Sequence, residues 1–296
     1  MFEKLKANLF FEILLKRHNI DKAYAMVGPE DSWYDTITTV HKSLAKMKKL
    51  PCEDWQVTSH DGLKQKAVFY SGSSDKTMIW VHGYTSHAER ESAFPALFYR
   101  SLGFNVLIPY LRAHGPSEGK YISFGPKELL DMTMWVDQVN ARFPEGEILL
   151  HGLSMGGGIV LDLATVELKN VRGLVADAPV EGLPDAFKGM MSHIFKKDYE
   201  KIYPHFCQRF RKEFSADVAD FDRIENIKKG KYPLLLSAGS NEKMDANLNL
   251  IKQNHPCDTV VLILPGCNHG NGMYKQTELY QATIRKFIER NFSFDT

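Results

Sequence analysis

A Gly-x-Ser-x-Gly pattern, supplied by Gly152, Ser154 and Gly156, is the most informative feature of this chain. An apolar run at 148–150 precedes it, and a helix-compatible stretch at 158–168 follows it. A serine placed between a buried strand and a helix stands on a sharp, strained turn that lifts its hydroxyl clear of the sheet. This context predicts that Ser154 is a nucleophile. The alternative is a glycine-rich turn whose serine only caps the helix.

Short apolar runs bounded by turn residues predict seven strands. They are 67–70, 78–81, 106–109, 148–150, 173–176, 234–237 and 260–264. Predicted helices alternate with the strands, at 92–102, 126–142, 155–168, 246–253 and 277–291. The last five strands are continuously hydrophobic, as expected when both faces of a parallel sheet are covered. The alternation therefore predicts an α/β fold with a mostly parallel, doubly wound sheet.

Two segments fall outside this alternation and divide the chain. Residues 1–50 are expected to form an N-terminal helical extension, and residues 181–231 a helical cap or lid insertion. The remaining parts, 51–180 and 232–296, then form the α/β core. With 296 residues and 44% apolar content, the chain is large enough to bury such a core.

The insertion is rich in aromatic residues. Tyr199, Tyr203, Phe206 and Phe210 are spaced four, three and four apart, which predicts one apolar stripe on a helix. Ligands of open α/β sheets bind at the carboxyl edge of the strands. We therefore expect the insertion to form a lid there, with some of its rings lining a substrate pocket.

The N-terminal segment contains an apolar run at 9–15 that is interrupted by Glu12 and followed by Lys16 and Arg17. The run is too short and too interrupted to span a bilayer, so no stable membrane insertion is expected. An amphipathic helix that packs on the domain is the favoured interpretation, and a membrane-surface helix is the alternative. The four cysteines form no C-x-x-C pair, which favours reduced thiols and a cytoplasmic protein.

Charge and motif content exclude several classes of function. The net charge of +1 offers no basic surface for nucleic acid. No H-E-x-x-H motif and no paired Cys/His spacing occurs, so neither a metal nor another cofactor is predicted.

A serine nucleophile needs a base on a loop at the same sheet edge. His269 fits this requirement because it lies in the loop 265–270, after the strand 260–264 and before the last helix. His114, in a loop near the same edge, is the competing candidate.

The base in turn needs an orienting carboxylate, which should follow the strand 234–237. Glu242 comes three residues after Gly239, close enough to the strand end to reach the histidine loop. Asp245 is the alternative acid, although it could instead cap the next helix. Asp177 is a third choice, with a more plausible role in binding backbone N–H groups of adjoining loops.

An oxyanion hole requires two backbone N–H donors beside the nucleophile. Met155, directly after Ser154, should supply one of them from the helix N-terminus. Tyr84 should supply the other, because Gly83 permits a sharp turn after the strand 78–81.

In these features the chain resembles the α/β-hydrolase superfamily. The resemblance rests on the order Ser154, Glu242, His269 and on the turn at 82–84. The loop 111–119 is similar to the Arg-Gly-His-Gly-x-Ser-x-Gly loop of the serine aminopeptidase and carboxylesterase-like branch. Members of that branch are mostly esterases or peptidases without cofactors.

The resemblance extends over about residues 61–291 and includes the Asp-Ala-Pro sequence at 177–179. The chain departs from the branch at three points. Ala113 replaces a glycine, residues 237–239 replace a usual Ile-His-Gly, and Glu242 stands where aspartate is commoner. Either carboxylate can orient an imidazole, so the third departure leaves the expected mechanism unchanged.

Together these features predict a serine hydrolase that cleaves carboxylic esters through an acyl-enzyme, with a small-molecule ester or a short peptide as its substrate. An aminopeptidase of the same fold is the alternative. It would need a carboxylate in the insertion to pair with the substrate amine, and the candidates are Glu181, Asp185, Asp198 and Glu200. A non-catalytic protein that binds a small molecule is a third possibility.

Overall fold

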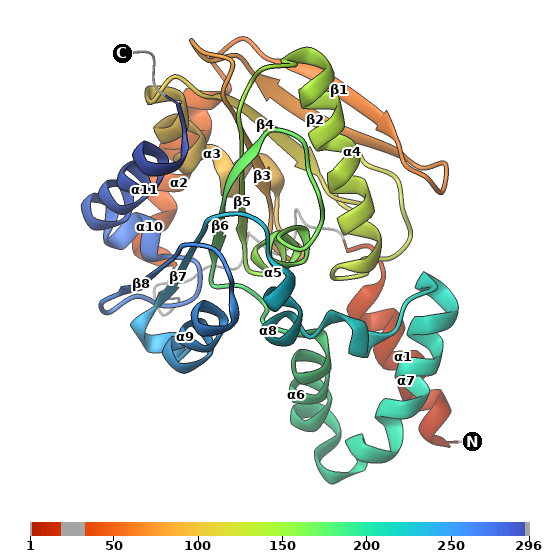
Figure 1. The fold of residues 1–296 in the computed structure, drawn as a ribbon. Helices are drawn as coiled ribbons and strands as arrows, with labels where there is room; N and C mark the ends of the chain where they lie inside the picture. The colour runs from red at the N-terminus through yellow and green to blue at the C-terminus, as the bar shows by residue number, and fades with distance from the viewer. Residues whose placement is uncertain (1, 19–32, 294–296) are drawn as a thin grey trace.

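The computed structural model describes residues 2–18 and 33–293. These residues form an eight-stranded sheet in the order β1-β2-β4-β3-β5-β6-β7-β8, with helices on both faces (Figure 1). The strands are β1 (Glu53–Thr58), β2 (Lys64–Tyr70), β3 (Thr77–Val81), β4 (Asn105–Tyr110), β5 (Ile148–Leu153), β6 (Val171–Asp177), β7 (Leu234–Gly239) and β8 (Thr259–Leu264). The predicted α/β fold is confirmed.

The sheet is parallel from β4 to β8, whereas β2 runs antiparallel to both β1 and β4. Strand β1 was not among the predicted strands. This strand lies at the edge of the sheet and turns only Trp55 and Val57 inward, so it has no continuous apolar run. Trp55 stacks on Phe69 of β2 with ring centroids 4.5 Å apart, which fixes the edge strand to the core.

Helices cover the two faces of the sheet as separate layers. The principal helices are α1 (Phe2–Leu15), α2 (Tyr34–Met47), α3 (Ala88–Ser101), α4 (Pro126–Arg142), α5 (Met155–Leu163), α6 (Leu183–Phe195), α7 (Tyr199–Phe214), α9 (Asp245–Asn254) and α11 (Thr277–Asn291). Helices α4, α5 and α9 contribute to the core on one face. Helices α2, α3 and α11 contribute to the core on the other.

Helix α5 is shorter than predicted and ends at Leu163 rather than at residue 168. The backbone carbonyl of Ala164 accepts a hydrogen bond from the N–H of Lys231, and the hydroxyl of Thr165 donates to the carbonyl of Asp162. In a helix that continued to residue 168, the carbonyl of Ala164 would accept a hydrogen bond from within the helix. Here Lys231, at the end of the insertion, donates to it instead.

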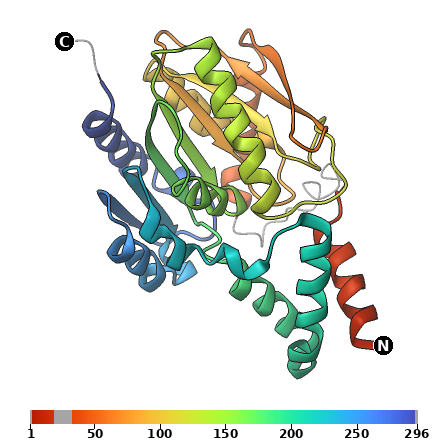
Figure 2. The same cartoon turned by 45° about the vertical axis from the view of Figure 1, so that its right-hand side comes forward.

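The two helices of the predicted N-terminal extension occupy different places. Helix α1 lies beside α7 of the insertion, in a part of the molecule that projects away from the sheet (Figures 1 and 2). Helix α2 instead packs beside α3, on the opposite face of the sheet. The rest of the predicted extension, at 19–32, lies outside the described residues.

The interface between α1 and the insertion is built from aromatic rings. Phe10 and Phe11 of α1 both contact the ring of Phe206, with centroids 5.5 and 5.9 Å apart. Helix α1 therefore packs mainly on the insertion, and it also contacts the core, where the ring of Phe11 lies 5.3 Å from that of Tyr121. No helix within the described ranges 2–18 and 33–293 combines the length and apolar character that a membrane crossing requires.

Candidate active site

Ser154 stands on the predicted sharp turn between β5 and α5. Its backbone has φ 59° and ψ −116°, a conformation that is strained for a residue with a side chain. A Cβ atom on Gly152 would lie 2.3 Å from the carbonyl oxygen of Gly156, and one on Gly156 would lie 1.9 Å from that of Val81. Both glycines are therefore required because the neighbouring backbone leaves no space for a side chain.

The structure brings Ser154, His269 and Glu242 into one chain of hydrogen bonds. Ser154 Oγ lies 2.9 Å from His269 Nε2, and His269 Nδ1 lies 2.5 Å from Glu242 Oε2. The other carboxylate oxygen of Glu242 accepts the backbone N–H of Gly239 at 2.8 Å. If Nδ1 carries the proton donated to Glu242, Nε2 is left to accept the serine proton.

Burial differs along this chain of three residues. The side chain of Glu242 is 9% exposed, whereas that of His269 is 55% exposed. The carboxylate is therefore held by the protein, while the imidazole remains open to a substrate. This arrangement can supply a serine with a base and the base with an orienting acid, the set that nucleophilic catalysis requires.

The two alternative acids lie elsewhere. Asp245 is exposed at the start of α9, where Met244, not Asp245, occupies the N-cap position. The suggested capping role of Asp245 is therefore wrong. Asp177 is buried, and its carboxylate accepts hydrogen bonds from three side chains rather than from the expected backbone groups. The three are His151, Ser237 and Tyr280.

His114, the competing base, supports the neighbouring loop instead of facing the serine. Its Nε2 accepts the backbone N–H of Thr85 at 3.2 Å, and its Nδ1 lies 2.9 Å from the carbonyl oxygen of Arg112. Burial lowers the pKa of His114 to about 4. Both ring nitrogens are thus engaged in holding backbone segments.

The turn at 82–84, which is expected to supply the second oxyanion donor, is held by hydrogen bonds to two other segments of the chain. Inside the turn, His82 accepts the backbone N–H of Leu111 at Nε2, 3.0 Å away, and its Nδ1 lies 2.8 Å from the carbonyl oxygen of Gly83. The N–H of Gly83 donates to the carboxyl group of Glu91 at 3.1 Å. Tyr84, next in the chain, lines the same cavity as Ser154. Its role as a donor, like that of Met155, stays a prediction.

Glu91 was not predicted to belong to the site. Its carboxyl group is buried against the turn, and it also accepts the indole N–H of Trp80 at 2.9 Å. Burial raises the pKa of Glu91 to about 7. In the sequence it is one of two acidic residues in the first turn of a helix, and only the fold places it against the turn at 82–84.

A cavity of about 320 Å³ opens beside Ser154 and His269. One of its walls comes from α2 and the residue before it, which contribute Trp33, Ile37, Val40 and His41. Among the described residues that line this cavity, none belongs to 181–231. The expectation that aromatic rings of the insertion would line the pocket is therefore not met here. The amphipathic pattern of residues 34–47 is a sequence signal for a helix with one apolar face, but it does not indicate which part of the molecule that face contacts.

Within the described part of the chain, one group of side chains has the spacing of a metal site. It consists of His60, Asp61 and Asp131. Arg112 already forms ion pairs with both carboxylates, at 3.0 Å to Asp61 and 2.8 Å to Asp131. A metal ion would have to displace this guanidinium, so the group is better described as a salt-bridge network.

Comparison with protein families matches residues 72–229 to the serine aminopeptidase family S33. The chain belongs to this family. The matched segment includes Ser154 and the turn at 82–84, but it ends before Glu242 and His269. The multifunctional-autoprocessing repeats-in-toxin proteins of Vibrio vulnificus and Vibrio cholerae are each 32% identical over 142 residues. That match covers 45% of this chain but only 3% of each toxin.

Solved structures of similar proteins share the fold of this chain. An esterase from Pyrococcus furiosus is 27% identical, with a TM-score of 0.65 over 84% of this chain and 94% of the esterase. Est1E from Butyrivibrio proteoclasticus, solved with ferulic acid bound, is 20% identical and shares the fold, with a TM-score of 0.63 over 80% of this chain and 98% of that protein. The chain therefore belongs to the α/β-hydrolase superfamily.

Proposed function

We propose that the protein is a serine hydrolase that cleaves carboxylic esters through an acyl-enzyme intermediate. The observation that carries this proposal is the hydrogen-bonded chain from Glu242 through His269 to Ser154, which ends at the wall of a cavity. A nucleophile, a base and an orienting acid in this order are the set that acyl transfer requires.

In the first half of the reaction, Ser154 Oγ attacks the ester carbonyl while His269 Nε2 takes the serine proton. Glu242 stabilises the resulting imidazolium, and the backbone N–H groups of Met155 and Tyr84 bind the carbonyl oxygen as it becomes negative. When the tetrahedral intermediate collapses, the C–O bond to the alcohol breaks and the imidazolium protonates the departing oxygen. The acyl group is then held on Ser154 as a new ester.

In the second half, water takes the place of the alcohol. His269 removes a proton from the water as it attacks the acyl carbonyl, and the same proton returns to Ser154 Oγ when the acyl–enzyme bond breaks. The products are a carboxylic acid and the free enzyme, so no external proton donor or cofactor is consumed.

The lining of the cavity favours esters over peptides with a free amino terminus. None of the four acids considered for binding a substrate amine lines the cavity within the described residues. Asp198 pairs with Lys6 at 3.2 Å, and Glu181 accepts the side-chain amide of Asn247 at 2.6 Å. Glu91 does line the cavity, but Gly83 and Trp80 already donate to its carboxyl group.

The Ser154→Ala variant tests the proposal. Turnover of p-nitrophenyl butyrate should fall by at least about 10³-fold, and labelling by a fluorophosphonate probe should disappear, while the melting temperature stays near that of the wild type. Unchanged turnover would remove Ser154 from the mechanism. An aminoacyl anilide assayed in parallel decides the substrate class, because faster cleavage of the anilide than of the ester would favour an aminopeptidase.

A matched pair of variants tests the choice of acid. Glu242→Gln should lower kcat by roughly 10²- to 10⁴-fold, because the neutral amide no longer stabilises the imidazolium or fixes its tautomer. Asp245→Asn, three residues away and exposed, should leave kcat unchanged. The reverse result would transfer the role of the acid to Asp245.

A further inference from the structure

Helix α1 is apolar on two opposite faces. One face, which includes Phe10 and Phe11, is buried against the insertion. The opposite face carries Phe2, Leu5, Leu9 and Ile13, which are 59% to 64% exposed. Their spacing of three, four and four places them in one row along the helix. We call this row the α1 stripe.

The α1 stripe differs from ordinary exposed hydrophobic residues. Nine large hydrophobic side chains are exposed within the described ranges, and four of them belong to this one helix. The others are distributed over α2, α4, α6, α9 and α11. Scattered apolar residues on a surface need no explanation, but a contiguous row of large ones indicates a surface that contacts something apolar.

The part of the molecule that carries the stripe is also basic. It consists of residues 2–17 and 183–214, and we call it the distal module. Residues 2–17 contain four basic and two acidic residues, and 183–214 contain seven basic and four acidic residues. The whole chain has 37 basic and 36 acidic residues, so the remainder is net acidic. The excess of positive charge thus lies in the distal module.

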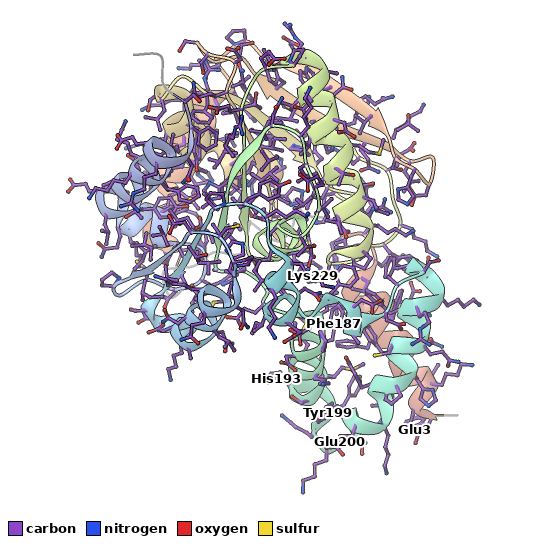
Figure 3. The ribbon with its side chains drawn as sticks, in the orientation of Figure 1. Glu3, Phe187, His193, Tyr199, Glu200 and Lys229 are labelled. Carbon is purple, nitrogen blue, oxygen red and sulfur yellow. The ribbon has the colours of Figure 1, made fainter. Side chains whose placement is uncertain are left out.

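The distal module lies at the end of the molecule farthest from most of the sheet. Glu3, Tyr199 and Glu200 are at its tip, with His193 on the neighbouring helix α6 (Figure 3). Lys4 of α1 and Lys16, directly after this helix, are exposed, as are Lys196, Lys197 and Lys201 of the insertion. An apolar row accompanied by lysines on a projecting element is the combination found in helices that lie at the membrane interface.

We propose that the distal module docks on an anionic lipid surface, with the α1 stripe in the interfacial layer and the lysines facing the headgroups. Burial of the stripe and attraction of lysines to anionic lipids would act together, because each alone gives only weak binding. The helix lies on the surface and does not cross it.

A second copy of the chain fits the stripe less well. Four exposed side chains offer only a few hundred Å², whereas a stable protein interface buries about 800 Å² on each partner. Lys4 and Lys16 would also be brought toward the same basic residues of the second copy if two stripes packed together. A lipid surface supplies both the missing apolar contact and the opposite charge.

Docking through α1 would also fix the orientation of the cavity relative to the lipid surface. The last turn of α1 is joined to the core near Ser154, because the carbonyl oxygen of Leu14 accepts the hydroxyl of Tyr84 at 2.5 Å. Arg17, just beyond the helix, donates to the carbonyl oxygen of Ser117 at 2.7 Å. A surface that binds the stripe therefore holds the enzyme by a helix whose last turn is hydrogen-bonded to Tyr84, a residue that lines the cavity.

The test is co-sedimentation of the full chain with lipid vesicles. The wild type should bind vesicles of phosphatidylcholine with about 30% phosphatidylglycerol, and bind pure phosphatidylcholine at least about tenfold more weakly. Raising NaCl from about 50 mM to about 500 mM should weaken binding through charge screening. The double variant Leu5→Gln, Leu9→Gln keeps good helix formers on α1 and should weaken binding at least about tenfold.

The matched control is Leu130→Gln with Leu279→Gln, which changes two exposed leucines on α4 and α11 and should bind like the wild type. Hydrolysis of a short soluble ester and an unchanged melting temperature show that both variants are folded. Equal vesicle binding by the wild type and the stripe variant would overturn the proposal, and so would no binding by the wild type. A wild-type dimer that the stripe variant converts to a monomer, measured by light scattering, would also overturn it and assign the stripe to a second copy.

Discussion

The helix α2 and the insertion at 181–231 are both additions to the α/β core, yet they lie in different relation to Ser154. Ile37 and Val40 of α2 line the cavity beside the serine. The insertion instead buries Phe187, Phe206 and Phe210 in a cluster that α1 completes. Richness in aromatic residues thus marks a local core here, and a less conspicuous amphipathic helix supplies the wall of the pocket.

The insertion is anchored to the core by a buried ion pair. Arg223, near its end, donates to the carboxylate of Asp162 of α5 at 2.7 Å and to the carbonyl oxygen of Phe124 at 2.7 Å, and both charged side chains are buried. A buried ion pair is costly to break because either partner would be left as an uncompensated charge. The insertion is therefore expected to act mainly on stability, and α2 mainly on substrate selection.

The largest expected effect is on stability and belongs to the insertion. Phe206→Ala should lower the free energy of unfolding by about 3–5 kcal/mol, because it removes a fully buried ring from the cluster shared with α1. The ester kcat/KM of the folded protein should stay close to wild type, as Phe206 does not line the cavity. Urea unfolding measures the first quantity and initial rates the second.

Ile194→Ala is the control, since Ile194 is exposed on the same insertion and should change stability by less than about 0.5 kcal/mol. If Phe206→Ala abolished turnover without loss of stability, the insertion would have to be placed in the active site and the contrast with α2 would fail.

An intermediate effect is expected from α2 and concerns selectivity. Val40→Trp should reduce the cavity volume and lower kcat/KM for p-nitrophenyl hexanoate by about 10- to 100-fold, or about 1.4–2.7 kcal/mol. The acetate ester, which needs less space, should be affected far less. Thr38→Trp, on an exposed position of the same helix, is the control and should leave both rates unchanged. Equal losses for the two esters would mean that α2 does not form the acyl wall.

Sequence reasoning was strongest where one local pattern carries the information. The turn at Ser154 was predictable because only glycine fits at 152 and 156, and the central strands were predictable because burial on both faces demands apolar runs. The edge strand β1 was missed because four of its six residues face solvent. Local signals of this kind do not depend on what the rest of the chain does.

Other parts of the site depend on contacts between distant segments. The sequence left Glu242 and Asp245 as alternatives, since both follow β7 by a few residues, and only the geometry shows which carboxylate lies beside His269. The contribution of α2 to the cavity depends on how α2 packs across α3, which periodicity within residues 34–47 cannot give. Glu91 could likewise be recognised only from the structure, because its contact with the turn at 82–84 depends on the fold.

The smallest expected effect is on the pH dependence of stability, and it concerns two buried carboxyl groups, one beside the insertion and one beside the cavity. Asp162, on the side of the insertion, is paired with Arg223, whereas Glu91, below the cavity that α2 covers, accepts hydrogen bonds from an indole and a peptide N–H. Burial raises the pKa of Glu91 from 4.5 to about 7, so the folded protein holds a proton that the unfolded chain has released. Stability therefore falls as pH rises between these two values and levels off above the higher one.

From pH 6 to pH 8 this group alone should remove about 1 kcal/mol from the free energy of unfolding. Glu91→Gln cannot ionise and should lack that part of the decrease, although it is less stable overall because its amide N–H₂ cannot accept the hydrogen bonds that both carboxyl oxygens accept. Urea unfolding of the two proteins at both pH values gives the difference directly, and other titrating groups cancel because they are common to both. Parallel losses in the two proteins would show that Glu91 keeps one protonation state across this range, and the contrast with Asp162 would then rest on hydrogen-bond partners alone.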